Sequence, residues 1–227
     1  MSISYGTNPD QIIEVRAGRE GAHRPLVVII HGGFWRPDID RTHARPMADA
    51  VAAAGWTVAL PEYSRVLHDP QPTLTDIRLL LAQSVRGIVP HNGQVVLVGH
   101  SAGGHLALWA AAAHVCPTLT GTVALAPVAD LALAHRLGLG GGAVLRFLGA
   151  EPGTRPDLDP SRMPPAPGVT TLIHGVNDDT VPLQISESYV ASHPTARLVA
   201  VADAGHYEVI DPQAAAWSSV MAAVAQF

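Results

Sequence analysis

A serine stands at the centre of the pattern Gly-x-Ser-x-Gly in residues 99–103, GHSAG. The apolar run Val95–Val98 precedes this pattern, and the stretch Gly103–His114, rich in small and apolar residues, follows it. A strand, a tight turn and a helix in this order are typical of a nucleophile elbow, which lifts a serine hydroxyl above the carboxyl end of a sheet. The two glycines are needed because strand and helix backbones approach too closely for side chains. The sequence therefore predicts that Ser101 is a nucleophile.

A serine hydroxyl needs a base to take its proton, and that base needs an acid to orient it. His206 lies in a loop five residues beyond the expected strand Arg197–Val201 and directly follows Gly205. Two carboxylates, Asp178 and Asp179, lie just beyond the expected strand Thr170–His174. Carboxyl ends of parallel strands share one edge of a sheet, where α/β folds bind their ligands. The spacing predicts His206 as the base and leaves both aspartates open as the acid.

Other ionisable or nucleophilic side chains near these candidates have simpler explanations. His100 neighbours the nucleophile and His174 ends a strand, so we expect structural roles for both. Asp203 is only three residues from His206, too near in sequence to approach its ring well. The single cysteine, Cys116, is expected to be a packed thiol.

Acyl transfer also requires N–H donors for the oxyanion that forms when a carbonyl is attacked. One donor is expected to be the backbone N–H of Ala102, directly after the nucleophile. The apolar run Leu26–Ile30 leads into residues 31–35, HGGFW, whose glycines allow a close backbone approach, so Gly33 and Phe34 are the other expected donors. No nucleotide-binding loop and no zinc-binding motif occurs, so we expect neither cofactor nor metal.

Composition limits the kinds of partner. Of 227 residues, 48% are hydrophobic and 15% charged, and the net charge of −5 comes without a basic cluster. These values favour a small-molecule ligand over nucleic acid or a membrane surface. No secretory signal or run of about 20 apolar residues is seen, which predicts a cytoplasmic protein and leaves a homodimer open.

Apolar runs of strand length alternate with helical stretches, which predicts an α/β fold with a mostly parallel sheet covered on both faces. Strands are expected at Ile12–Arg16, Leu26–Ile30, Thr57–Leu60, Val95–Val98, Thr122–Leu125, Thr170–His174 and Arg197–Val201. Helices are expected at Ala44–Ala54, Leu74–Ile88, Gly103–His114, Leu183–Ser192 and Pro212–Val224, the last with Asp211 as its N-cap. Residues 1–227 are expected to form a single domain, with the Gly- and Pro-rich residues 129–168 as a short cap over the cleft.

Five segments together carry a family resemblance: HGGFW at 31–35, LPEYSR at 60–65, GHSAGG at 99–104, HGVNDDTVP at 174–182 and HYEVID at 206–211. They resemble the α/β-hydrolase superfamily, and within it the esterase/lipase branch with an HGG oxyanion loop. The resemblance implies an α/β-hydrolase fold and identifies Asp178, the first aspartate of its segment, as the acid. The chain looks most like the kynurenine formamidase-type subgroup. Hormone-sensitive-lipase-like carboxylesterases are near neighbours, and their HGGG and GDSAGG motifs differ from those of this chain.

The combined expectation is a serine hydrolase in which Ser101, His206 and Asp178 cleave a small-molecule ester, formamide or thioester through an acyl-enzyme. Two alternatives stay open, a non-hydrolytic acyl-transfer, cyclisation or elimination enzyme and a binding protein without turnover. Residues expected to line a substrate pocket are Trp35, Tyr63, Leu137 and Tyr207.

Overall fold

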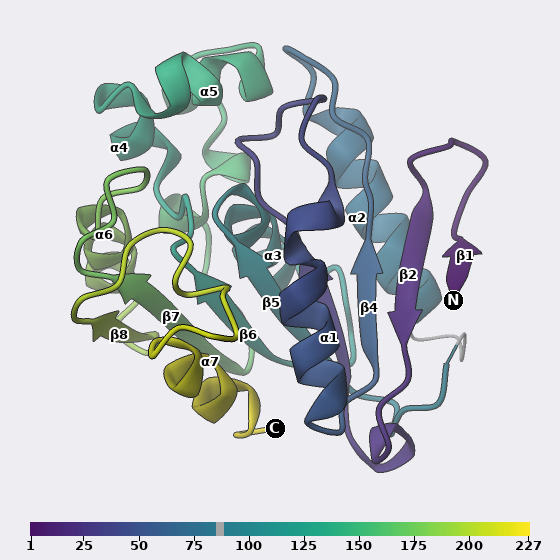
Figure 1. Ribbon diagram of the computed structural model, residues 1–227. Coiled ribbons are helices and arrows are strands. Elements are labelled where there is room, and N and C mark those ends of the chain that lie inside the picture. The colour runs from purple at the N-terminus through teal and green to yellow at the C-terminus, as the bar shows by residue number, and fades with distance from the viewer. Residues whose placement is uncertain (85–88) are drawn as a thin grey trace.

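The structure, a computed structural model, describes residues 1–84 and 89–227, and its strands form one sheet of eight (Figure 1). In chain order the strands are β1 (Ser2–Ser4), β2 (Ile12–Arg16), β3 (Leu26–Ile30), β4 (Val58–Pro61), β5 (Val95–His100), β6 (Leu119–Leu125), β7 (Val169–Gly175) and β8 (Arg197–Val201). Their order across the sheet is β1-β2-β4-β3-β5-β6-β7-β8. β1 and β2 are antiparallel to their neighbours, and all other pairs are parallel.

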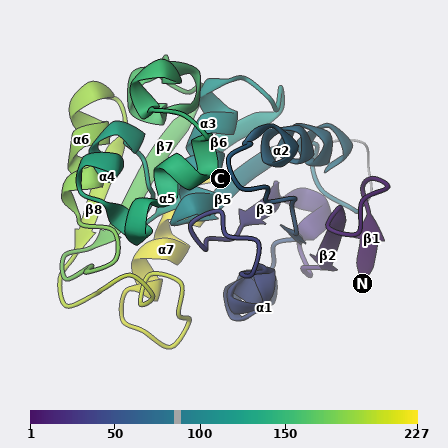
Figure 2. The same ribbon diagram turned by 90° about the horizontal axis from the view of Figure 1, so that it is seen from above.

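Helices cover both faces of the sheet (Figure 2). They are α1 (Arg45–Ala53), α2 (Gln71–Ser84), α3 (Ala102–Ala112), α4 (Leu131–Arg136), α5 (Leu139–Leu148), α6 (Gln184–Ser192) and α7 (Trp217–Val224). Alternate side chains of β3 point to opposite faces, so Val28 joins one buried cluster, with α2 and α3, and Val27 joins the other, with α1 and α7. Both faces of the central strands are apolar because helices bury both of them.

The sequence-based expectation of an α/β-hydrolase fold with a mostly parallel sheet is confirmed. β2, β3 and β8 begin and end where expected, and the other expected strands differ by at most three residues at either end. β1 was not expected, because three residues with two serines carry too little apolar pattern. The expected helix Leu74–Ile88 is observed as α2, and its last four residues lie outside the described residues.

The expected start of the last helix at Pro212 is wrong. The Asp211 carboxylate accepts a hydrogen bond from the backbone N–H of Gln213 at 2.9 Å, which stabilises a local turn. Successive turns follow, and α7 begins at Trp217. Asp211 therefore caps a turn and not the helix.

Residues 129–168 form α4, α5 and three short 3₁₀ turns, which lie beyond the carboxyl ends of the strands (Figure 1). Within α5 the run Gly140–Gly142 has left-handed backbone, which only glycine adopts readily. The buried Asp159 ties the segment together by accepting the backbone N–H groups of Leu131 and Ala132 at 3.1 and 3.2 Å. No helix in the described part of the chain is both long and apolar enough to cross a bilayer.

Candidate active site

Ser101 occupies the turn between β5 and α3. Its backbone angles, φ 55° and ψ -119°, are ones that residues other than glycine rarely adopt. Two hydrogen bonds to the neighbouring loop hold it there. Its N–H donates to the Leu125 carbonyl at 2.9 Å, and its own carbonyl accepts from the Val128 N–H at 3.1 Å. The backbone strain at this serine is thus held by the end of β6, as a nucleophile elbow requires.

The glycines on either side of Ser101 have no room for a side chain. A Cβ on Gly99 would lie 2.2 Å from the Gly103 carbonyl oxygen, and one on Gly103 would lie 2.1 Å from the Ile30 carbonyl oxygen. The turn therefore brings α3 against both β5 and the end of β3. This close approach is the physical reason for the Gly-x-Ser-x-Gly spacing.

His206 and Asp178 meet in a buried hydrogen bond from the ring Nδ1–H to the carboxylate Oδ2 at 2.7 Å. Their side chains are 4% and 0% exposed, so water competes little for this contact. With Nδ1 donating, Nε2 is the ring nitrogen left to accept a proton. Asp179, the other candidate acid, is exposed, so the structure brings Asp178 and not Asp179 to the histidine.

Asp178 is held as a carboxylate by its surroundings. Burial raises its pKa, but hydrogen bonds from His174 and His206, together with backbone donation, outweigh burial and hold the pKa well below its ordinary value. Oδ1 accepts the N–H groups of Thr180 and Val181 at 2.9 and 2.7 Å. An ionised Asp178 can stabilise the positive charge that a base at His206 acquires.

Two histidines for which the sequence predicts structural roles, His100 and His174, contact His206 and Asp178. His100 donates from Nε2 to the His206 carbonyl at 2.9 Å, and burial lowers the pKa of its ring, so it stays neutral. His174 Nε2 lies 2.7 Å from the Val181 carbonyl and 3.3 Å from Asp178 Oδ2. The His100 contact joins loops 106 residues apart in the chain, whereas the His174 contacts stay within residues 174–181.

The glycine loop after β3 lies directly against the elbow. A Cβ on Gly32 would lie 3.0 Å from the Cβ of Ser101, and φ is positive at Gly33 (118°) and Phe34 (50°). Gly33 and Phe34 line the same pocket as Ser101. The three expected oxyanion donors, Gly33, Phe34 and Ala102, therefore come from the two loops that flank the serine.

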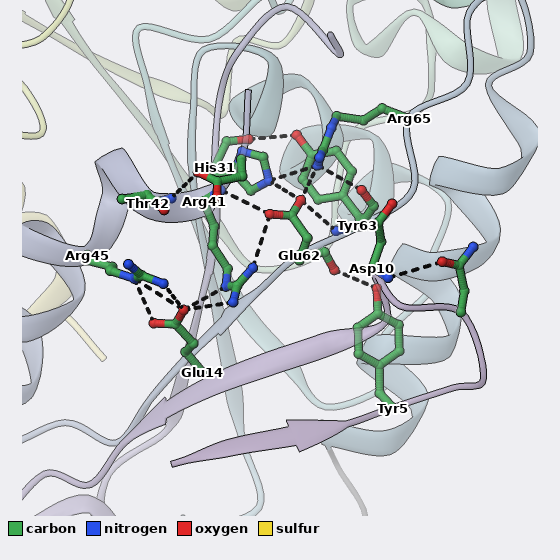
Figure 3. Close-up of polar contacts among 12 residues, drawn as sticks. Tyr5, Asp10, Glu14, His31, Arg41, Thr42, Arg45, Glu62, Tyr63 and Arg65 are labelled. Carbon is green, nitrogen blue, oxygen red and sulfur yellow. Dashed lines mark hydrogen bonds and ion pairs between the residues drawn. The ribbon is translucent and has the colours of Figure 1, made fainter. Parts of the chain in front are cut away.

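Buried charges support this loop from below (Figure 3). Glu62, at the end of β4, is 3% exposed and pairs with His31, Arg41 and Arg65. Burial raises the Glu62 pKa, yet these neighbours together hold it well below its ordinary value. The Tyr63 hydroxyl donates to the His31 carbonyl at 2.9 Å, and its ring stacks on His31 with centroids 4.4 Å apart. The first residue of the glycine loop is thus fixed on several sides.

Ser101 and His206 line one pocket of about 340 Å³. Its other lining residues are Gly33, Phe34, Arg36, Ile39, His43, His100, Thr180 and Tyr207. Arg36, Ile39, His43 and Thr180 were not expected, because no local motif marks loop residues that meet only in the fold. Among the described residues, no group of three or more His, Cys, Asp or Glu side chains is placed to hold a metal ion.

Of the four side chains expected to line a substrate pocket, Tyr207 does so and three lie elsewhere. Trp35 turns into the core, where it stacks on Phe147 with centroids 4.5 Å apart. Tyr63 is fully buried beneath His31, and Leu137 is exposed at the end of α4. Residues 129–168 are not among the residues that line the pocket. They do approach it, since a Cβ on Gly140 would lie 3.0 Å from the ring of Phe34, which lines the pocket.

A family model described as BD-FAE matches residues 13–127, just over half of the chain, from β2 through the elbow to the end of β6. The chain belongs to the BD-FAE family. This membership places it in the esterase branch of the α/β-hydrolase superfamily and identifies it as a hydrolase enzyme. The catalytic histidine and acid proposed for this BD-FAE member lie beyond the matched region. No curated protein matches the chain.

Solved structures of esterases share the fold of this BD-FAE protein. A putative thioesterase from Silicibacter sp. tm1040 is 23% identical with a TM-score of 0.80, over 99% of this chain and 84% of that one. Esterase B from Lactobacillus rhamnosis is 22% identical with a TM-score of 0.82, over 99% and 83%. A truncated carbohydrate esterase from gut microbiota is 15% identical with a TM-score of 0.83, over 100% and 95%.

Proposed function

We propose that this BD-FAE protein is a serine esterase that hydrolyses a carboxylic ester of a small molecule through an acyl-enzyme. The observation that carries the proposal is the buried hydrogen bond between His206 and Asp178 beside the pocket that Ser101 lines. A serine in a strained turn, an imidazole beside it and an ionised carboxylate are the parts that nucleophilic acyl transfer needs.

In the proposed reaction, Ser101 Oγ attacks the carbonyl carbon while His206 Nε2 takes its proton. The oxyanion is held by the N–H groups of Gly33, Phe34 and Ala102. The C–O bond then breaks, and His206 returns the proton to the departing alcohol. Water attacks the acyl-enzyme with His206 again as base, which releases the acid and restores the serine hydroxyl.

An aryl formamide is the second candidate substrate, because two aromatic side chains, Phe34 and Tyr207, line the pocket. The formyl group is small, so a ring would occupy most of the space beside Ser101. Ser101, His206 and Asp178 would cleave the formamide by the same steps and release formate and an arylamine.

Steady-state assays with p-nitrophenyl acetate and N-formylkynurenine test both candidates. We expect turnover of the ester with release of free acid. Ser101→Ala should abolish the turnover, and Asp178→Asn should lower kcat by about 10⁴-fold, since the wrong tautomer of His206 is then favoured. Equal turnover by wild type and Ser101→Ala would contradict the proposal. Faster cleavage of the formamide than of the ester would assign the formamide as the preferred substrate class.

A further inference from the structure

A second hollow of about 220 Å³ opens beside the pocket of Ser101. Its lining residues are His43, Pro46, Tyr207, Ile210, Asp211 and Pro212. His43 and Tyr207 line both hollows, so the two meet at this pair of side chains. We call the second hollow the Pro46 pocket.

The Pro46 pocket is mainly apolar. Pro46 and Pro212 bring no donor, and Ile210, which is 7% exposed, adds an apolar side chain to the lining. The Asp211 carboxylate, the one acid in the lining, already accepts the backbone N–H of Gln213 at 2.9 Å. Tyr207 presents an aromatic ring that is 62% exposed, so a large apolar surface faces solvent beside the reacting groups.

The chemistry of His206 decides which half of a substrate can reach this pocket. His206 must give its proton to the departing oxygen, so the alcohol half of an ester leaves past the histidine. Tyr207 directly follows His206, and their rings touch edge to face with centroids 5.2 Å apart. The glycine loop and its oxyanion donors do not line the Pro46 pocket. The alcohol half is therefore the one that faces it.

We propose that the Pro46 pocket binds the alcohol half of the ester and that this half is an apolar ring or branched chain. The inference rests on the proposed esterase function and adds the substrate class to it. The bound group would cover the exposed ring of Tyr207 and displace water from the apolar wall.

Three esters test the assignment: ethyl acetate, cyclohexylmethyl acetate and ethyl cyclohexylacetate. The last two carry the same ring on the alcohol and on the acyl side, respectively. Pro46→Glu places a carboxylate in the pocket at an exposed position in the first turn of α1, where the helix tolerates negative charge. Ala53→Glu adds the same charge at an exposed position near the other end of α1, outside both pockets.

We expect wild type to favour cyclohexylmethyl acetate over ethyl acetate in kcat/KM. Pro46→Glu should lower that preference about tenfold, as loss of an apolar contact does, while Ala53→Glu leaves it unchanged. An unchanged preference in Pro46→Glu, or an equal loss for ethyl cyclohexylacetate, would overturn the inference. If wild type hydrolysed none of the three esters, the esterase function itself would be contradicted. This outcome is distinct from the two results that overturn only the assignment of the Pro46 pocket.

Discussion

At the scale of single residues, the elbow is the part of the site that sequence predicts best. Its spacing records a backbone constraint, since Gly99 and Gly103 face carbonyl oxygens that no Cβ could approach. The acid is different, because Asp178 and Asp179 are adjacent and both lie just beyond the same strand. Only the family resemblance separated them, and the structure shows the physical reason: Asp178 is buried against two N–H groups and His206, whereas Asp179 is exposed.

The constraint at Gly103 predicts a measurable loss of stability. Gly103→Ala would place a Cβ 2.1 and 2.4 Å from the carbonyl oxygens of Ile30 and His31, both rigid backbone atoms. We expect a loss of about 2 kcal/mol or more in the free energy of unfolding, measured by urea denaturation. Gly153→Ala is the matched control, because nothing lies within 4 Å of a Cβ there. Equal stability of the two variants would contradict the close packing at the elbow.

At the scale of elements, short apolar runs predicted the strands well, because helices bury both faces of the central strands and leave a continuous apolar signal. Most of the pocket lining was not predicted. Arg36, Ile39 and Thr180 belong to loops that become neighbours only through the strand order, and no local pattern encodes that. Trp35 fits the same rule, since its ring packs under α5 instead of facing the serine.

The buried ion pairs of Glu62 hold the glycine loop in place, so we expect their removal to lower the free energy of unfolding. Glu62→Gln keeps the shape of the side chain but removes the carboxylate that pairs with Arg65, which is 5% exposed, and leaves Arg41 with Glu14 as its acidic partner. Removing one partner of a buried ion pair typically costs about 3–5 kcal/mol, and we expect a loss of this size in urea denaturation.

Asp157→Asn is the control for Glu62→Gln. It breaks an ion pair with Arg155 in which the Asp157 side chain is 60% exposed and water solvates the carboxylate. An exposed pair contributes about 1 kcal/mol or less. If both variants lost the same free energy of unfolding, the buried charges around Glu62 would stabilise the fold no more than an exposed ion pair does.

At the scale of the whole molecule, buried histidines couple stability to pH. His105 is fully buried in α3, its Nε2 donates to the Leu158 carbonyl at 2.8 Å, and burial lowers its pKa from 6.5 to about 4. Between these values the unfolded chain binds a proton that the native chain does not, so unfolding becomes more favourable as pH falls. The structure as a whole thus depends on keeping His105 neutral.

We expect this histidine to contribute a loss of about 3 kcal/mol in the free energy of unfolding as pH falls from 7 to 4. His105→Gln, which cannot take up the proton, should show a shallower dependence over the same range. Urea denaturation at several pH values measures both slopes. Parallel curves for wild type and His105→Gln would show that His105 is not the residue that carries the effect.

Covalent labelling tests whether Ser101 is an activated nucleophile. A fluorophosphonate should add one phosphonyl group to each wild-type chain, located on Ser101 by mass spectrometry of peptides. Folded Ser101→Ala should take up none, and Ser161→Ala, a serine outside the active-site pocket, should label as wild type does. A folded wild type that stays unlabelled, or a Ser101→Ala variant that labels equally, would contradict the account.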